Sequence, residues 1–355
     1  MLLYNNILYI DDIKNTCTID LPWNKLKNNS ILVSGATGMI GSFLIDVIMY
    51  KNMFENLHCT VYALGRSLEK AQKRFLKFYG NKFFNFIQYD VNTPFTDNRI
   101  KDIGYVIHLA SNTHPMQYAT DPIGTITANI FGVKNMLDLC SLFPNSRFVF
   151  ASSNEIYGEN RGDVELFDEN YCGYINSNTL RAGYPESKRC GEALCQAYKS
   201  QRNVDFVIAR LTRSYGPTLL PSDTKALSQF LHNALSGNDI VLKSKGTQFY
   251  SYTYTADAVS GLLTLMLRGV SGEAYNISNP ASDIMLKDLA QLIAKYCNKK
   301  VIFELPNATE KSGYSTATKA RLESSKLRQL GWIPQYTMDD GIKRTIEILK
   351  DLSSD

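Results

Sequence analysis

The segment from Gly35 to Gly41, GATGMIG, restricts the fold of this chain more than any other feature of the sequence. It directly follows the apolar run 31–35 and opens the apolar stretch 42–50, which is the pattern of a buried strand that turns into a helix. Glycines allow the tight turn and a close backbone approach, and the amino end of the helix attracts phosphate. We therefore expect this loop to bind the pyrophosphate of a dinucleotide. The expected contacts are Gly35, Thr37, Gly38, Met39, Ile40 and Gly41.

Short apolar runs rich in β-branched and aromatic residues alternate with amphipathic stretches over the first part of the chain. The runs that we expect to form strands are 31–35, 60–64, 83–90, 105–110, 147–153 and 204–211. This alternation predicts an α/β fold of the Rossmann type, a doubly wound parallel sheet with helices on both faces. After Pro217 the pattern becomes irregular, which predicts a smaller C-terminal α+β lobe that binds the substrate.

The same pattern predicts how the chain is divided. We expect an N-terminal extension at 1–29, which forms a short helix packed on the main domain. A dinucleotide-binding domain follows at 30–212, and segments near 240–279 are expected to return to it. The substrate-binding lobe is expected at 213–239 and 280–355. Later helices are expected at 225–236, 286–297 and 339–351.

Composition and charge argue against several other classes of protein. The net charge is only +4 and no run of Lys or Arg occurs, so we expect no nucleic-acid or membrane partner. The seven cysteines contain no CxxC pair, which predicts reduced thiols and no metal site. The apolar start of the chain lacks a basic segment and is interrupted by Asp11 and Asp12, so we expect neither a signal peptide nor a membrane span. The protein is accordingly expected in the cytoplasm.

The end of the second expected strand bears on the choice between NAD and NADP. NAD enzymes usually have an acidic residue there, which hydrogen-bonds the adenosine ribose and repels a 2′-phosphate. This chain has Arg66 and Ser67 instead, and both side chains can donate hydrogen bonds to a phosphate. We therefore expect NADP, with NAD as the alternative. Further cofactor contacts are expected at the ends of the third and fourth strands, at Asp90, Val91, Ala110 and Ser111.

Tyr184 and Lys188 are four residues apart in the segment YPESK and would lie on one face of a helix. A tyrosine that acts as a base near neutral pH must form a phenolate well below its ordinary pKa, and a nearby ammonium stabilises that phenolate. The lysine can also hold the nicotinamide ribose. Ser153, at the end of the fifth expected strand, completes a Ser-Tyr-Lys catalytic set.

With these motifs the chain resembles the extended short-chain dehydrogenase/reductases that modify nucleotide sugars. The resemblance covers nearly all of the chain after residue 30 and includes GATGMIG, HLAS, SSNEIYG, YPESK, RLTRSYGP and LGWIP. It implies that Tyr184 and Lys188 oxidise a sugar at C4, that hydride passes to the nicotinamide, and that the ketone acidifies the C5 proton. It also implies a C2 homodimer formed by the helices around 125–141 and 184–200.

The segment Ser153-Asn154-Glu155 bears on the chemistry that follows oxidation. In this family a carboxylate at Glu155 is similar to the 4,6-dehydratases and the UDP-glucuronate decarboxylases, whereas plain 4-epimerases tend to have a small residue there. Many dehydratases carry an acid where this chain has Asn154, although some dehydratases and the decarboxylases have a neutral residue. We therefore expect 4,6-dehydration, with decarboxylation as a close alternative, followed by 4-epimerisation. A sensor that binds NADP without turnover is a fourth alternative.

The expected substrate contacts come partly from the resemblance. Asn176 and Arg181 stand where the decarboxylases have an Asn and an Arg before the catalytic tyrosine. Arg213 and Tyr250 depart from the family, which typically has Asn and Arg at these places, so either a cation that faces the diphosphate has exchanged strands or the diphosphate is held differently. The Arg-Lys-Pro-Asp segment of the decarboxylases is also replaced, by the region around 313–315 and Arg321.

Overall fold

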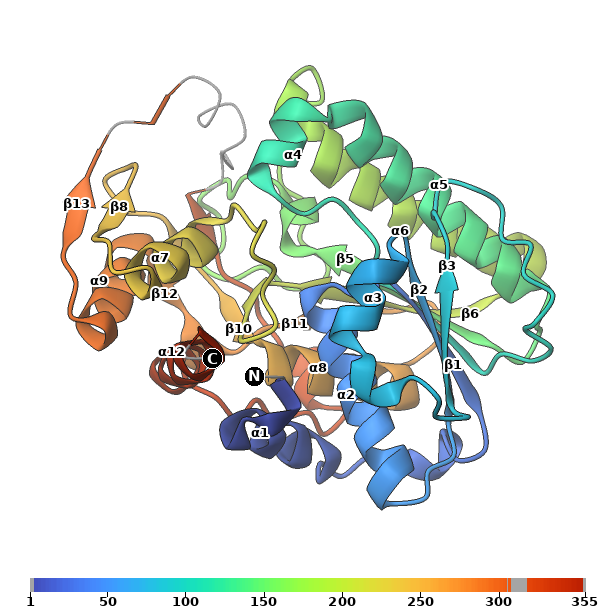
Figure 1. Ribbon diagram of the computed structural model, residues 1–355. Coiled ribbons are helices and arrows are strands. Elements are labelled where there is room, and N and C mark those ends of the chain that lie inside the picture. The colour runs from blue at the N-terminus through green and yellow to red at the C-terminus, as the bar shows by residue number, and fades with distance from the viewer. Residues whose placement is uncertain (1–2, 305, 308–317, 354–355) are drawn as a thin grey trace.

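The structure is a computed structural model that describes residues 3–304, 306–307 and 318–353 (Figure 1). Its centre is a seven-stranded sheet in the order β11-β6-β5-β4-β1-β2-β3, and all neighbouring strands run parallel. The strands are β1 (Ser30–Ser34), β2 (Thr60–Gly65), β3 (Phe84–Gln88), β4 (Tyr105–His108), β5 (Arg147–Ser153), β6 (Asp205–Leu211) and β11 (Ala274–Ile277). The strand order reverses between β1 and β4, as in dinucleotide-binding sheets, and confirms the predicted fold class.

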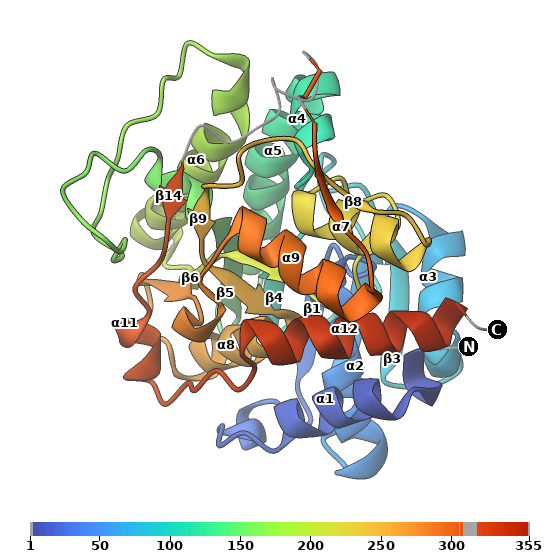
Figure 2. The same ribbon diagram turned by 90° about the vertical axis from the view of Figure 1, so that its left-hand side faces the viewer.

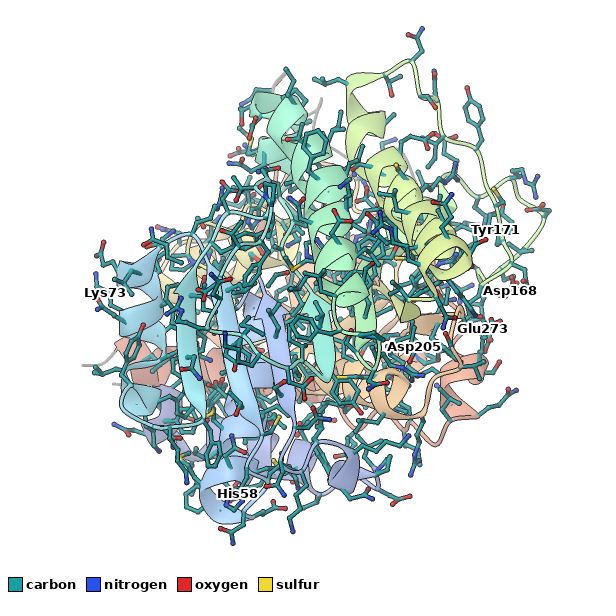
Figure 3. All side chains as sticks on the ribbon, turned by 90° about the vertical axis from the view of Figure 1, so that its right-hand side faces the viewer. His58, Lys73, Asp168, Tyr171, Asp205 and Glu273 are labelled. Carbon is teal, nitrogen blue, oxygen red and sulfur yellow. The ribbon has the colours of Figure 1, made fainter. Side chains whose placement is uncertain are left out.

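Helices cover both faces of this sheet (Figures 1 and 3). Alternate residues of β1 point to opposite faces, so Ile31 and Val33 pack in the core that holds Phe43, and Leu32 packs in the core that holds Val133. No helix in the described part of the chain is long and apolar enough to span a membrane. The first face is covered by α1 (Ile7–Cys17), α2 (Met39–Phe54) and α8 (Thr255–Arg268), and the second by α5 (Pro122–Ser141) and α6 (Gly183–Arg202).

The other elements form a smaller lobe beside the sheet (Figure 2). Its helices α7 (Ala226–Leu235), α9 (Leu286–Cys297) and α12 (Met338–Ser353) confirm the expected helices at 225–236, 286–297 and 339–351. Between them lie short strands that pair in small groups. These groups are β7 (Arg213–Tyr215) with β10 (Tyr252–Tyr254), β8 (Ile240–Leu242) with β13 (Val301–Phe303), and β9 (Phe249–Tyr250) between β12 (Ile284–Met285) and β14 (Lys319–Ala320).

The chain passes between the sheet and the lobe more than once. Within 240–279, β8 pairs with β13 in the lobe, whereas α8 and β11 belong to the main sheet and its helices. Short elements also follow the strands of the main sheet. They are α3 (Leu68–Arg74), α4 (Pro115–Thr120), and the single turns η4 (Asn154–Tyr157) and η5 (Leu180–Ala182), with α11 (Ser325–Arg328) near the end of the chain.

Helix α1 joins the two ends of the chain to the rest of the molecule. The Asp12 carboxylate is fully buried and accepts hydrogen bonds from Arg344 Nε of α12 at 2.8 Å and from the Tyr254 hydroxyl at 2.5 Å. Tyr9, on the same helix, donates to the Asp46 carboxylate of α2, which also pairs with Arg74. These buried contacts fix α1 on the main sheet, where the sequence predicts a short packed helix.

Candidate active site

The glycine loop lies between β1 and α2, and its glycines pack closely against protein backbone. Gly35 has φ +71°, and a Cβ added to it would lie 2.8 Å from the backbone nitrogen of Ala110. A Cβ on Gly41 would lie 2.5 Å from the Gly35 carbonyl oxygen. Among the described residues no side chain caps the amino end of α2 at Gly38, so its N–H groups are available to a ligand. This cradle fits the pyrophosphate of a dinucleotide.

The residues expected near the adenosine lie at the carboxyl ends of β2 and β3. Arg66 is exposed there. Ser67 uses its hydroxyl to cap α3, where it accepts from Lys70 N at 3.2 Å. The carboxylate of Asp90 accepts from the backbone N–H of Asn92 at 2.9 Å, within its own turn. Of Arg66, Ser67 and Asp90, Arg66 is therefore the one whose side chain is exposed and does not stabilise a local turn or helix cap.

A chain of hydrogen bonds links the end of β4 to the helix that carries Tyr184 and Lys188. The Ser111 hydroxyl donates to Asn129 Oδ1 of α5 at 2.7 Å, and Asn129 Nδ2 donates to Ser187 Oγ of α6 at 2.9 Å. Asn129 is fully buried. Ala110 N in turn donates to Ser34 Oγ of β1 at 3.4 Å. The carboxyl edge of the sheet and α6 are thus held in one arrangement.

Helix α6 begins at Gly183 and places Tyr184 and Lys188 one turn apart, beside the end of β5. The Lys188 ammonium is almost completely buried and donates to the Ala151 carbonyl of β5 at 2.9 Å. Burial lowers the pKa of Lys188 to about 7. Burial and then the charge of the Glu155 carboxylate raise the pKa of Tyr184 to about 12, although Ser153 and the charge of Arg181 act to lower it. Lys188 Nζ is 5.9 Å from the centre of the Tyr184 ring.

Glu155 and Arg181 form an ion pair with each other. Arg181 Nη2 donates to Glu155 Oε2 at 2.5 Å, and both side chains are largely buried. Glu155 follows β5 on η4, and Arg181 precedes α6 on η5, so the connection between these elements returns to the same edge of the sheet. The sequence presents the two as separate groups, one a base and the other a substrate contact. The structure instead makes each the partner of the other.

A pocket opens at this ion pair. It brings together Asn154, Glu155, Asn176, Arg181 and Arg213, all of which were expected in the site. Asn154 is nearly buried, whereas Asn176 is exposed on a turn, where its side chain accepts from Asn178 N. The rest of the wall consists of Gly158, Glu159, Tyr174, Ile175, Thr179, Ala182, Pro185 and Ala320. No group of His, Cys, Asp and Glu within the described ranges could hold a metal ion.

Arg213 and Tyr250 meet although they lie on different strands, β7 and β9. The guanidinium carbon of Arg213 is 3.5 Å from the centre of the Tyr250 ring, so the two side chains stack. Arg213 Nη1 is buried and has no hydrogen-bond partner among the described residues. Tyr252 and Tyr254 are buried, and Tyr254 bonds Asp12, so these two tyrosines serve packing. A stacked guanidinium with an unused donor therefore faces the pocket.

Tyr118 of α4 also contacts the site. Its ring stacks on the Tyr184 ring with ring centres 4.7 Å apart, and the Arg181 guanidinium lies 4.8 Å from the centre of the Tyr118 ring. The sequence analysis missed this residue because a tyrosine in a short helix carries no motif.

Residues 313–315 lie outside the described part of the chain. Arg321 stacks on Phe249 at 4.5 Å.

The parallel sheet, its glycine loop and the Tyr-Lys pair on α6 define the class of extended short-chain dehydrogenase/reductases. More particularly, the model of the NAD dependent epimerase/dehydratase family matches residues 31–278, and the chain belongs to that family of enzymes.

Relatives and solved structures agree with this membership. UDP-glucuronic acid decarboxylase 1 from Danio rerio is 31% identical over 318 residues, which are 89% of this chain and 72% of the relative. UDP-glucuronic acid decarboxylase 3 from Arabidopsis thaliana is 30% identical over 89% of this chain and 87% of its own. The fold is shared with dTDP-glucose 4,6-dehydratase from Streptomyces venezuelae, solved with NAD (TM-score 0.78, 20% identity, 92% of this chain and 98% of that chain). It is also shared with UDP-glucuronic acid 4-epimerase from Bacillus cereus, solved with UDP-glucuronic acid and NAD (TM-score 0.77, 22%, 91% and 99%).

Proposed function

We propose that this protein oxidises C4 of a nucleotide-linked uronic acid with a bound nicotinamide dinucleotide and then releases the C6 carboxylate as CO₂. The observation that carries the proposal is the pocket in which the Glu155–Arg181 ion pair lies beside the Ser153-Tyr184-Lys188 set. The two sequence relatives described above are both named as UDP-glucuronic acid decarboxylases and support the same reaction.

The cofactor would be held by groups on the carboxyl edge of the sheet. The N–H groups of the loop from Gly35 to Gly41 fit its pyrophosphate, and Lys188 would hold the nicotinamide ribose. Arg66 would meet the adenosine ribose and, in NADP, its 2′-phosphate. When bound, the dinucleotide supplies the hydride acceptor for the C4–H bond and returns that hydride at the end.

Side chains of the protein transfer the protons in this reaction. Tyr184 accepts the proton of the C4 hydroxyl, and Ser153, which lowers the pKa of Tyr184, favours the phenolate that accepts it. Oxidation at C4 makes the substrate a β-keto acid. Its C5–C6 bond breaks, the electron pair stays on C5 as an enolate, and CO₂ leaves. C5 takes a proton from water in the open pocket, so this reaction requires no base at C5.

Two guanidinium groups on the pocket wall favour an anionic sugar. Arg181 Nε and Arg213 Nη1 are both buried without a hydrogen-bond partner in the part of the chain that is described. Buried donors of this kind are costly unless a bound group satisfies them. A nucleotide-linked uronic acid offers two suitable anions, because its C6 carboxylate can bind Arg181 and its diphosphate can bind Arg213.

4,6-Dehydration of a neutral hexose is the second candidate. It is supported by the Glu155 carboxylate on the pocket wall, which could remove the C5 proton. Expulsion of the C6 hydroxyl needs a proton donor, however, and Asn154 cannot supply one. Glu155 is also engaged by Arg181 at 2.5 Å.

Purified protein with NAD⁺ or NADP⁺ should be incubated with UDP-glucuronate, dTDP-glucose and GDP-mannose, and the products identified by mass spectrometry. Loss of CO₂ from UDP-glucuronate supports the proposal, and loss of water from a neutral sugar favours dehydration. Tyr184→Phe should abolish either reaction, with a loss at the upper end of about 10²–10⁴-fold, because it removes the proton acceptor. Conversion of none of the three would overturn both candidates for these sugars.

Glu155→Gln distinguishes the candidates. In a dehydratase it should leave C4 oxidation intact, so a 4-keto sugar accumulates while turnover falls by about 10²–10⁴-fold. In a decarboxylase the loss should be only about tenfold, because it reflects one weakened charged hydrogen bond to Arg181.

We also propose that two copies pair through α5 and α6, which run side by side (Figure 3). Ile123 and Phe131 of α5 are 75% and 49% exposed, which is costly for apolar side chains in water and is relieved by a second copy. Light scattering at micromolar concentration should give twice the chain mass. A particle of 40.0 kDa would contradict the dimer.

A further inference from the structure

Arg189 of α6 joins two segments of the pocket wall to the helix that carries the catalytic tyrosine. Its Nε donates to the Ile156 carbonyl oxygen at 2.7 Å, and its Nη2 donates to the Gly173 carbonyl oxygen at 2.9 Å. Ile156 follows Glu155 on η4, and Gly173 directly precedes the segment 174–176, which lines the pocket. One guanidinium therefore connects both segments to α6.

The two segments are also joined to each other through their backbones. The Gly173 N–H donates to the Tyr157 carbonyl oxygen at 2.8 Å, and the Glu159 N–H donates to the Tyr174 carbonyl oxygen at 2.9 Å. A Cβ on Gly173 would lie 2.3 Å from the Glu159 carbonyl oxygen, so the two segments are in close contact. Together they form a wall unit, which consists of residues 154–159 and 173–176.

The wall unit offers carbonyl groups that need a partner of this kind. Because η4 is a single turn, its last carbonyl groups have no acceptor role within the turn. A guanidinium is a planar fork that donates from two nitrogens at once, whereas the ammonium of a lysine is a single point. Glu186, on the preceding turn of α6, lies 4.0 Å from Arg189 Nη1 and leaves Nε and Nη2 to the two carbonyl oxygens.

We propose that Arg189 is a positioning residue for the reaction: it fixes the wall unit, and with it Glu155, relative to Tyr184, so that the sugar is aligned with its proton acceptor. This inference rests on the proposed function, because it takes the pocket wall to be the part that holds the sugar. A displacement of about 1 Å between reacting groups can cost about 10²-fold in rate, so the clamp acts on the chemical step.

Two variants of Arg189 remove the clamp to different degrees. Arg189→Met removes both hydrogen bonds and keeps the length of the side chain, whereas Arg189→Lys keeps the charge but can reach only one carbonyl oxygen. With UDP-glucuronate and NAD⁺, kcat should fall by about 100-fold in Arg189→Met and by about tenfold in Arg189→Lys. KM should rise by less than about threefold, because Arg213 on β7 would still bind the diphosphate. The calorimetric affinity for NAD⁺ should stay within about twofold.

Arg147→Lys is the matched control. Arg147 also donates to two backbone carbonyl oxygens, those of Met266 and Gly269, but it begins β5 at the amino-terminal edge of the sheet. This variant should lower the midpoint of thermal unfolding at least as much as Arg189→Lys does, while kcat and KM stay unchanged. An equal loss of kcat in the two lysine variants would indicate a general loss of stability and overturn the inference. A wild-type kcat in Arg189→Met would also overturn it.

Hydrogen exchange measured by mass spectrometry needs no turnover and separates this inference from the proposed reaction. The amide protons of Gly173 and Glu159 are hydrogen-bonded within the wall unit, so they exchange slowly while the unit is held in place. Exchange in peptides that span the wall unit should become about tenfold faster in Arg189→Met and should not change in Arg147→Lys. If none of the sugars is converted, faster exchange still supports Arg189 as the group that fixes the wall unit. Unchanged exchange overturns the inference in every case.

Discussion

The cofactor side and the substrate side of the candidate active site differ in the groups that form them. The cofactor side uses the backbone: Gly35 supplies a positive φ, and the helix that begins after Gly38 supplies N–H groups. The substrate side uses side chains in pairs, Glu155 with Arg181 and Arg213 with Tyr250, carried by single turns and strands of two or three residues. The first side depends on where a strand ends. The second depends on how short segments from distant parts of the chain meet.

This difference determines how each side can be altered. A backbone cradle tolerates almost no side chain at its glycines. Arg213 on β7 and Tyr250 on β9 belong to different small sheets, yet they stack and place one cation on the pocket wall. The cofactor side therefore predicts the class of enzyme, and we propose that the substrate side sets the particular substrate.

Gly35→Ala should have the largest effect, because it tests the cofactor side directly. The new Cβ would lie 2.8 Å from a backbone atom, and the residue would need φ +71°. Such strain is of the order of 1–3 kcal/mol, so the affinity for NAD⁺ measured by calorimetry should fall by about 10–100-fold. Gly80→Ala is the matched control, because Gly80 has φ +86° and nothing lies within 4 Å of the added Cβ. If Gly80→Ala weakens NAD⁺ binding equally, the cradle has no special role.

Arg213→Ala tests the substrate side and should act on substrate binding alone. Loss of one charged hydrogen bond should raise KM for the nucleotide sugar by about tenfold, while kcat changes by less than about threefold. Arg321→Ala is the control, because Arg321 also stacks on an aromatic ring of β9 but lies within 4.0 Å of Glu165 and Asp283. Affinity for NAD⁺ should be unaffected in both variants. An effect of Arg213→Ala on NAD⁺ binding would show that the two sides are not separate.

The smallest expected effect is that of Arg66→Ala. Arg66 is exposed, so its pairing with a 2′-phosphate is screened, and we expect the preference for NADP⁺ over NAD⁺ to fall by only about three- to tenfold. Calorimetric affinities for the two cofactors measure this directly. The affinity for NAD⁺ should change less than the affinity for NADP⁺, because NAD⁺ has no 2′-phosphate. Tighter binding of NAD⁺ than of NADP⁺ by the unaltered protein would contradict the assignment of Arg66.

The sheet, its flanking helices and the Tyr-Lys spacing could be predicted because each follows from a local pattern. Leu32 and its neighbours Ile31 and Val33 alternate between two cores, and Tyr184 and Lys188 are one helical turn apart. The contact between Glu155 and Arg181 could not be predicted in this way, because it depends on the path of the segment between them. Tyr118 was missed for the same reason, since its importance comes from contacts with residues far along the chain.

The buried Asp12 carboxylate sets the order in which the molecule can be completed. Its partners Tyr254 and Arg344 lie 242 and 332 residues further along the chain. During synthesis the first helix is therefore made long before the groups that neutralise its charge, and a buried charge without partners is strongly unfavourable. The contact between that helix and α12 can therefore form only after Arg344 has been synthesised. One buried carboxylate thus joins two helices that are made far apart in time.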